Sequence, residues 1–500
     1  MTEPPGDIVC GSLDAHAVRA GGSVALCDGR ETLTWQEFLA RTVAAETALS
    51  QTGASRLLRV DAGDPLTALV RLCAGARSGR IVLVADPVHW QRYGERLRTE
   101  LGPVADDEAF ANDDPAPRGP DDGDDGATGA AKGKPAARFR AGPLEPFYIG
   151  LTSGSTGMPK AFQRSHRSWT LSFRTCLEAF RIDGTDRVFV PGGIGHSLHL
   201  FGAMLALDSG LRLDIARRFQ PKAILRRMQA AGSSVLVATP TQLQLLARGA
   251  ASEGIRLPDL RRVLLSGAKW RNSERDLLAR MCPGAEVHEF YGTSETSFIS
   301  HRRAGDPPGS VGRPFEGVEV EIRGDDGERL AAGETGDIWV RSRLLFDGYV
   351  MGTEPMTRRD GGWVSVGDRG SLDGEGHLWL AGRKGRMIVT SGINVFAEEI
   401  EAALLQYPGI GQAAVFGLDD RLRGARIVAA IQLCDGALPD PQALRRHCLD
   451  LLEPAKVPRA FQFFSDWPLT PGGKSDLPAI AGEIEHREVA HDSVSRRTPA

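Results

Sequence analysis

The stretch Leu151–Lys160 reads LTSGSTGMPK and lies between a short apolar run at Phe147–Leu151 and an amphipathic helix pattern that opens at Ser165. Its composition suits a loop that holds phosphate, because glycines let the backbone approach a ligand, hydroxyls donate hydrogen bonds and the lysine adds a positive charge. A flexible glycine–serine turn is the simpler interpretation, but the strand–loop–helix context favours a phosphate loop. The loop is not an ordinary Walker A motif, because its lysine lies between proline and alanine.

A second candidate stretch is YGTSE at Tyr291–Glu295, which follows a short strand pattern at Glu286–Phe290. In a nucleotide site the ring could stack on a base, the hydroxyls could reach a phosphate and the carboxylate could hold Mg²⁺. Three further stretches complete the set: VGD at Val366–Asp368, GRKGR at Gly382–Arg386 and PLTPGGKSD at Pro468–Asp476.

In this order and spacing, these stretches resemble the adenylate-forming superfamily of acyl-CoA synthetases, peptide-synthetase adenylation domains and luciferases. The resemblance extends from about Phe147 to Leu477 and includes SVGRPFEGVEVEI at Ser310–Ile322. It implies an α/β fold in which a large N-terminal domain of parallel αβ sheets, with a β-barrel-like subdomain, precedes a small mobile α+β domain. We expect these domains at 1–382 and 383–480, followed by a tail at 481–500.

The remaining patterning agrees with that organisation. Between Phe147 and Gly292, apolar strand patterns alternate with helical ones, which predicts a parallel sheet with right-handed crossovers. From about Val311 to Leu380, short glycine-punctuated strands predict a β subdomain. A helix is expected at Ala397–Gln406. The segment 106–134 is rich in Asp, Gly, Ala and Pro, and is predicted to be a disordered insertion.

Composition excludes several classes of protein. The chain has 500 residues, a formal charge of −4 and 41% hydrophobic residues, so we expect two or more globular domains and no broad basic surface for nucleic acid. No apolar run could span a bilayer, and the first residues lack the pattern of a signal peptide, so a cytoplasmic location is expected. The seven scattered cysteines include no CxxC pair, which argues against a disulfide framework or a zinc site.

The resemblance implies that the chain activates a carboxylic acid with ATP. The acid oxygen attacks the α-phosphorus and pyrophosphate leaves, so the protein must supply cations and donors to the phosphates and a metal ion to the leaving group. By resemblance, the residues that would hold the β- and γ-phosphates are Thr152, Ser153, Gly154, Ser155, Thr156, Gly157 and Lys160. The residues expected around adenine and the α-phosphate are Gly267, Ala268, Tyr291, Gly292, Thr293 and Ser294. Glu295 is expected to hold Mg²⁺.

The C-terminal motifs receive roles in the same way. Asp368 would accept hydrogen bonds from the ribose hydroxyls, and Arg383 would touch ribose or phosphate. Lys474 would bridge the carboxylate and the α-phosphate during adenylation. Gly385 would be the hinge on which the small domain turns. The family commonly has aspartate or lysine at this position, and glycine leaves the pivot free to rotate.

The substrate pocket is less specified. Amino-acid-activating relatives place an aspartate in the segment equivalent to Pro191–Met204, but here that segment contains no acid, which argues against an α-amino acid substrate. His196 and His199 are both candidates for a pocket histidine, and one of them could instead be a satisfied core histidine. Ser266 is expected between the acyl pocket and adenine.

The leading hypothesis is therefore an AMP-forming acid:CoA ligase that uses ATP, Mg²⁺ and coenzyme A on a fatty or aryl acid. The first alternative is a stand-alone adenylation enzyme that loads a separate carrier protein, which would use the same catalytic residues. A second alternative is a degenerate nucleotide-binding protein. Lys160, Glu295, Asp368 and Lys474 argue against it.

Overall fold

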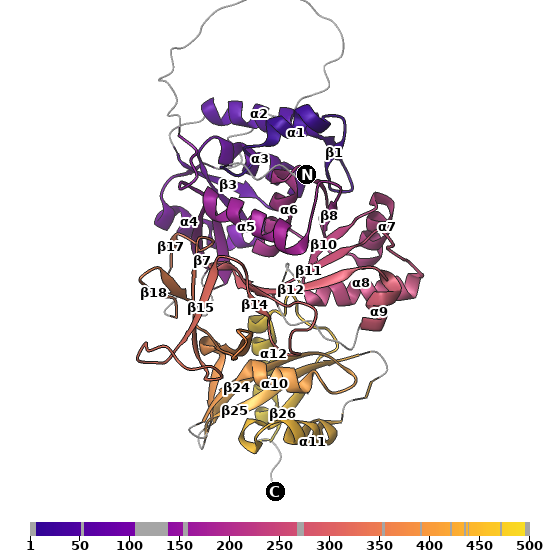
Figure 1. The fold of residues 1–500 in the computed structure, drawn as a ribbon. Coiled ribbons are helices and arrows are strands. Elements are labelled where there is room, and N and C mark those ends of the chain that lie inside the picture. The colour runs from indigo at the N-terminus through magenta and orange to yellow at the C-terminus, as the bar shows by residue number, and fades with distance from the viewer. Residues whose placement is uncertain are drawn as a thin grey trace, which may run out of the picture. The chain divides into compact units, whose positions relative to one another are not determined.

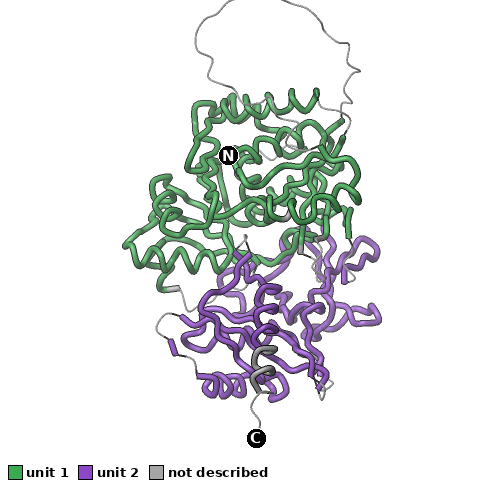
Figure 2. The backbone as a smooth tube through the Cα atoms, turned by 180° about the vertical axis from the view of Figure 1, so that it is seen from behind, with its two compact units in different colours: residues 1–154, 158–298, 343–353 green, residues 155–157, 299–342, 354–500 purple. Residues whose placement is uncertain are grey.

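The computed structural model describes residues 7–51, 55–105, 139–153, 159–267, 275–352, 356–390, 393–420, 423–434, 437–438, 440–470 and 473–495. The expected insertion at 106–134 lies outside them. The described residues of 1–154, 158–298 and 343–353 form one compact unit, unit 1, and those of 299–342 and 354–500 form unit 2 (Figure 2). No helix of the described chain has both the length and the apolar character that a membrane span requires.

Unit 1 contains the predicted parallel sheet (Figure 1). Its strands run in the order β12-β11-β10-β8-β9-β1-β2, and each neighbouring pair is parallel except the β1–β2 pair at one edge. The strands are β1 (Val24–Cys27), β2 (Thr32–Thr34), β8 (Arg187–Val190), β9 (Arg212–Ile215), β10 (Val235–Ala238), β11 (Arg262–Leu265) and β12 (Glu286–Thr293). The helices that follow β8 to β11 are α6 (Ser197–Asp208), α7 (Pro221–Ala231), α8 (Pro240–Glu253) and α9 (Arg275–Met281).

The local sequence explains these elements. All four residues of β10 are buried, as expected for a strand that helices cover on both faces. At the start of α8, the Thr239 side chain accepts from the Gln242 amide and the Gln242 side chain accepts from the Thr239 amide. This reciprocal capping, with Pro240 in the first turn, fixes where the helix begins.

The second sheet of unit 1 differs from the predicted strand–loop–helix arrangement. Strands β6 (Pro146–Ser153) and β7 (Pro159–Ser165) form an antiparallel pair, so a strand lies between the phosphate-loop motif and α5 (His166–Phe180). Because β7 and its partner β17 (Gly348–Met351) are antiparallel, this sheet is mixed and not wholly parallel.

The strand order of this second sheet is β17-β7-β6-β4-β3-β5. The other strands are β3 (Leu57–Asp61), β4 (Ile81–Ala85) and β5 (Val104–Ala105). The remaining helices of unit 1 are α1 (Leu13–Ala20), α2 (Trp35–Gln51), α3 (Pro65–Arg77) and α4 (Pro87–Leu101).

Unit 2 begins with the predicted helix-free β region. Strand β13 (Ser297–His301), which belongs to unit 2 from residue 299 on, pairs with β14 (Arg313–Pro314). An antiparallel sheet follows in the order β18-β19-β16-β20-β21, with β15 beside β16. Its strands are β15 (Val318–Arg323), β16 (Gly336–Ser342), β18 (Arg358–Asp360), β19 (Trp363–Ser365), β20 (Asp368–Leu372) and β21 (Leu378–Arg383).

The rest of unit 2 has the expected α+β character. Its strands are β22 (Met387–Thr390), β23 (Ile393–Phe396), β24 (Ile410–Asp420), β25 (Gly424–Leu433) and β26 (Ala460–Phe463). Its helices are α10 (Ala397–Leu404), α11 (Pro441–Leu451) and α12 (Leu477–Ser495), with short 3₁₀ turns η3 (Lys384–Arg386) and η4 (Pro454–Lys456). The predicted helix at Ala397–Gln406 is confirmed as α10, whose first turn carries two glutamates. The predicted boundary at 382 remains a prediction, since unit 2 contains residues on both sides of it.

Candidate active site

The end of β12 makes a tight turn that only glycine can enter. A Cβ on Gly292 would lie 1.8 Å from the carbonyl oxygen of Ser297, far inside contact distance. Ser297 itself has a left-handed φ of 59°. Thr293 and Thr296 close the turn, since each backbone amide donates to the other side chain, at 3.1 and 3.2 Å. Tyr291, on the same strand, is half-buried. The YGTSE motif therefore has a fixed backbone before any ligand arrives.

Glu295 is held at both its backbone and its side chain. The Tyr349 hydroxyl donates to its carboxylate Oε1 at 2.7 Å, and the Phe346 amide donates to its carbonyl oxygen at 2.8 Å. Both partners come from the short segment of unit 1 that contains β17. No described residue hydrogen-bonds the second carboxylate oxygen of Glu295, so that atom could accept a ligand.

A buried arginine lies beneath this loop. Arg164, on β7, donates to the carbonyl oxygens of Ser294 at 3.1 Å and Leu344 at 2.7 Å, and to the Ser168 hydroxyl at 3.0 Å. Its side chain is almost completely buried, and burial lowers its pKa to about 10 although Asp347, Tyr148 and Glu295 oppose the change. The guanidinium remains charged at neutral pH. Arg164 thus joins β7, the residue before Glu295 and the β17 segment.

Lys160 lies near the start of β7, paired in register with Thr152 on β6, and its side chain is buried. A Cβ on Gly352 would lie 3.3 Å from its Cγ, so the chain passes closely beside it. The predicted residues Gly154, Ser155, Thr156, Gly157 and Ala268 lie outside the described part of the chain, as does the side chain of Ser153. Ser266 and Gly267 directly follow β11, with Ser266 buried and Gly267 at a φ of +95°.

The two candidate histidines have different environments. The His199 ring is buried on α6, and its nitrogens lie 3.2 Å from the Gly193 carbonyl oxygen and 3.0 Å from the Gln242 side-chain oxygen. His196 is the half-buried residue before α6. Strands β8 and β10 are neighbours whose connections leave in opposite directions, and the loops at such a point commonly form a ligand crevice. Ser197, in the first turn of α6, contacts the Ser294 hydroxyl at 3.0 Å.

In unit 2, two of the predicted nucleotide ligands contact each other. The Arg383 side chain donates to Asp368 Oδ1 at 2.7 Å across the β20–β21 pair. Asp368 is buried and the Arg383 side chain is more than half exposed. The arginine orients this carboxylate, whose oxygens are acceptors suited to hydrogen bonds from hydroxyls.

The predicted hinge is flanked by ion pairs on its two sides. Lys384 lies 3.2 Å from Asp325 of the β region. Arg386 lies 2.6 Å from Glu401 and 3.0 Å from Glu398 of α10. Burial alone would lower the pKa of Arg386, but the two glutamates raise it above its ordinary value. Gly385 lies between Lys384 and Arg386 in the sequence, and a Cβ added to it would meet no atom within 4 Å.

Lys474 lies on a turn whose backbone is bonded within the turn. Its amide donates to the Thr470 hydroxyl at 3.2 Å, and its carbonyl oxygen accepts from the Thr470 amide at 2.7 Å. The side chain is exposed.

Two family models match this chain. One, described as "AMP-binding enzyme", matches residues 44–350, and the other, "AMP-binding enzyme C-terminal domain", matches residues 399–474. The chain belongs to the AMP-binding enzyme family.

Relatives and solved structures are consistent with membership of this family. The chain is 40% identical over 337 residues to "Uncharacterized acyl--CoA ligase YhfT" of Bacillus subtilis, which covers 66% of this chain and 67% of that one. It is 30% identical over 357 residues to "Sulfoacetate--CoA ligase" of Cupriavidus necator, covering 68% and 69%. The amide bond synthetase McbA from Marinactinospora thermotolerans superposes with a TM-score of 0.75 at 26% identity, over 95% of this chain and 99% of that one.

Within this AMP-binding fold, the predicted residues divide between the two units. Lys160, Tyr291, Ser294 and Glu295 belong to unit 1, and Asp368, Arg383 and Lys474 belong to unit 2. Three residues that hold the YGTSE loop were not predicted from the sequence: Arg164, Thr296 and Tyr349. Arg164 and Tyr349 lie in no recognisable motif, and their long-range contacts reveal them. Thr296 directly follows YGTSE, and its local bonds with Thr293 reveal it.

Proposed function

We propose that this AMP-binding enzyme activates a carboxylic acid that lacks an α-amino group, with ATP, and then transfers the acyl group to coenzyme A. The chain is an AMP-forming acid–CoA ligase, and the observation that carries this is its 40% identity with an acyl–CoA ligase over two thirds of both chains. The fixed YGTSE loop supports the adenylation step. Transfer to a carrier protein would use the same residues but is not favoured, because the relatives are CoA ligases.

The residues of unit 1 act on the phosphates. Lys160 offsets the charge of the β- and γ-phosphates, and Tyr291 packs on adenine. Arg164 does not touch the nucleotide. It positions the loop by holding the Ser294 carbonyl oxygen at 3.1 Å. Because these groups are held in place before ATP binds, little reorganisation remains for the reaction step.

The site fits a magnesium ion. Glu295 offers one carboxylate oxygen that the hydrogen bond from Tyr349 leaves available. In nucleotide sites, Mg²⁺ usually takes only one or two protein carboxylates, and phosphates and water supply its other ligands. When bound, Mg²⁺ neutralises charge on the leaving pyrophosphate. The Tyr349 hydroxyl keeps the Glu295 carboxylate oriented.

The residues of unit 2 supply the second set of contacts. Asp368 accepts hydrogen bonds from the ribose hydroxyls and keeps Arg383 beside it. Lys474 donates to the carboxylate and α-phosphate oxygens as the new bond forms. Rotation at Gly385 then exchanges the adenylation contacts for those of thioester formation, in which the CoA thiolate attacks the acyl carbonyl carbon and AMP leaves.

The acid itself binds near the start of α6. His196 is the better candidate for the pocket, because it is half-buried whereas the His199 ring is buried against Gly193 and Gln242. The segment Pro191–Met204 contains no carboxylate to pair with an ammonium group. Fatty, aryl and other acids without an α-amino group are therefore the substrates to test.

The test is an incubation of the full chain with ATP, Mg²⁺, CoA and a pooled panel of aliphatic, aryl and amino acids, read by mass spectrometry. We expect one acyl-CoA and an equal amount of AMP. Acyl-adenylate without a CoA thioester would favour the carrier-protein acceptor. An aminoacyl product would contradict the assignment of the acid pocket.

A further inference from the structure

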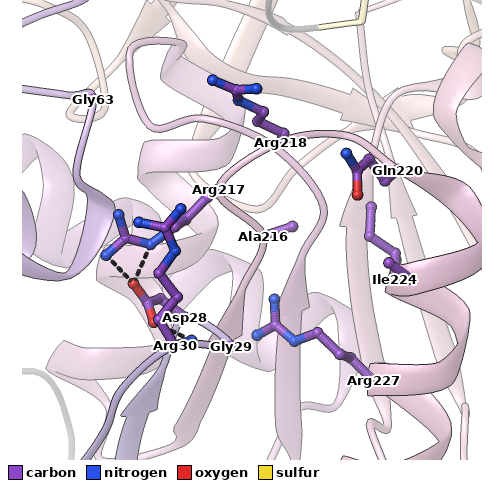
Figure 3. A pocket seen from close by; sticks show the side chains of 11 residues that line it. Asp28, Gly29, Arg30, Gly63, Ala216, Arg217, Arg218, Gln220, Ile224 and Arg227 are labelled. Atoms are coloured by element: carbon purple, nitrogen blue, oxygen red, sulfur yellow. Dashed lines mark hydrogen bonds and ion pairs between the residues drawn. The ribbon is translucent and has the colours of Figure 1, made fainter.

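A cavity of about 510 Å³ lies in unit 1, away from the motif-bearing loops. It is formed by the segments that follow β1 and β9 and by the first turns of α7 (Figure 3). Four arginines line it: Arg30, Arg217, Arg218 and Arg227. A cavity of this size is within the range that small-molecule sites occupy. None of the sequence motifs or proposed catalytic roles includes these residues.

One carboxylate of the wall is already neutralised. Asp28 is buried and accepts from the Arg30 and Glu31 amides at 2.8 and 2.9 Å. Its other oxygen accepts from Arg217, which also contacts Asp64 at 3.0 Å. Arg217 is thus fixed by two carboxylates and adds little net charge. The positive character of the cavity comes from the other three arginines.

Arg227 is held in advance at the floor of the cavity. It donates to the carbonyl oxygens of Ile215 at 3.0 Å and Cys27 at 3.2 Å, and lies 5.4 Å from the Phe189 ring centroid. Gly29 makes room for it: a Cβ there would lie 2.8 Å from the Arg227 guanidinium carbon, and its φ is +88°. A guanidinium has five N–H donors, and the two bonds leave donors for a ligand.

Arg30 and Arg218 flank the cavity and are exposed. Neither forms an ion pair with a carboxylate of the described chain. Their charges therefore add to that of Arg227 without an offsetting partner. Planar guanidinium groups bind phosphate oxygens in a two-pronged manner, which distinguishes them from lysines.

The cavity is separate from the YGTSE loop. In the sheet order, β9 is separated from β12 by β8, β10 and β11. Four strand spacings of about 4.8 Å give roughly 19 Å between the two strands. An ATP bound through the motifs of β12 and its neighbours leaves this edge of the sheet unused.

We propose that the cavity lined by Arg30, Arg218 and Arg227 binds a phosphate-bearing small molecule, at a site distinct from the nucleotide loops. The three cations surround a concave space, one of them is positioned by the backbone, and Gly29 keeps that space open. The phosphate could belong to CoA or to a separate phosphorylated metabolite. In both cases the guanidinium groups would donate hydrogen bonds to phosphate oxygens.

Hydrogen–deuterium exchange of the full chain tests the site directly, with inorganic pyrophosphate as the probe. We expect protection in peptides covering 28–31 and 216–224, in addition to protection of 151–160. In an Arg30→Gln, Arg218→Gln double variant, the pyrophosphate needed for cavity protection should rise by roughly tenfold for each arginine removed, because each loses a charge-assisted hydrogen bond.

Arg226→Gln is the matched control. Arg226 is the neighbour of Arg227 on α7 but pairs with Glu253 outside the cavity, at 2.9 Å. The pyrophosphate concentration needed to protect the cavity peptides should be the same in Arg226→Gln as in the unsubstituted chain. Protection of 151–160 alone, with exchange of the cavity peptides unchanged, would overturn the proposal. An equal loss of cavity-peptide protection in the double variant and in Arg226→Gln would also overturn it.

A second arm distinguishes the two sources of phosphate. Protection of 28–31 and 216–224 by CoA, lost in the double variant, would identify the co-substrate. Protection by pyrophosphate but not by CoA would identify a separate phosphorylated molecule. The acid:CoA ligase reaction is measured in parallel by acyl-CoA formation, so a failed site and a failed function can be told apart.

Discussion

The Glu295 loop of unit 1 and the Lys474 turn of unit 2 are built on different kinds of contact. Glu295 bonds with Tyr349, 54 positions away, and the adjacent Ser294 bonds with Arg164, 130 positions away. The backbone of Lys474 bonds with Thr470, four positions away. Long-range contacts fix a group relative to a whole domain, whereas a local turn fixes it only within its own segment. Contacts with distant residues therefore position the Glu295 loop within unit 1, whereas the Lys474 backbone is bonded within its own turn.

The largest expected effect is that of Lys474→Ala. Acid-dependent exchange of labelled pyrophosphate into ATP should fall by about 10³-fold, or roughly 4 kcal/mol, because the cation at the α-phosphate is lost. The side chain is exposed, so Tm should not change. Arg446→Ala removes an exposed cation from α11 of the same unit and should leave exchange unaltered. Unchanged turnover in Lys474→Ala would defeat its assignment.

Gly292, in the YGTSE turn of unit 1, and Gly385, the expected hinge in unit 2, should respond differently to substitution by alanine. Gly292→Ala would place a methyl group 1.8 Å from the Ser297 carbonyl oxygen, and we expect a loss of about 3 kcal/mol of unfolding free energy. Gly385→Ala meets no atom within 4 Å and should cost less than about 1 kcal/mol. Chemical denaturation of both variants measures the difference. Equal costs would mean that the YGTSE turn is not built as described.

Arg164→Met tests whether the buried arginine supports the loop. The variant loses the bonds to the carbonyl oxygens of half-buried Ser294 and buried Leu344 and offers neither a donor, so we expect a loss of roughly 2 kcal/mol in stability. Arg167→Met, three residues along and half-buried, is the control. Denaturant midpoints compare the two, and a midpoint for Arg164→Met that equals the control would argue against the role.

Tyr349→Phe should have the smallest effect. It removes the hydrogen bond to Glu295 Oε1, so kcat/KM for Mg-ATP should fall by about five- to tenfold, close to 1 kcal/mol. The Mg²⁺ concentration for half-maximal rate should rise. Tyr407→Phe, in unit 2, serves as the control. A loss of rate with no change in the Mg²⁺ dependence would separate Tyr349 from the metal site.

The sequence predicted the elements whose signals are local. The strands β8 to β12 and helix α10 follow from apolar periodicity, and the fold class follows from the motifs. Strand β7 was missed, because PKAFQRS carries a lysine and an arginine where a strand pattern expects apolar residues. Burial of those cations depends on partners elsewhere in the fold, such as the Leu344 carbonyl oxygen.

The same limit applied to the site. Motif positions such as Tyr291 and Lys474 could be named from sequence, since the resemblance assigns them residue by residue. The pairing of Asp368 with Arg383, and the choice between His196 and His199, needed the three-dimensional neighbours. Nothing in the sequence around Gly29 or Arg227 indicated a cavity.

The most direct test of the account follows one oxygen atom. An accepted acid labelled with ¹⁸O in both carboxylate positions is incubated with the full chain, ATP, Mg²⁺ and CoA, and the nucleotide products are analysed by mass spectrometry. If the acid oxygen attacks the α-phosphorus and the CoA thiolate then displaces AMP, the AMP carries one ¹⁸O for each acyl-CoA formed. Release of ADP with labelled inorganic phosphate, or of unlabelled AMP, would contradict it.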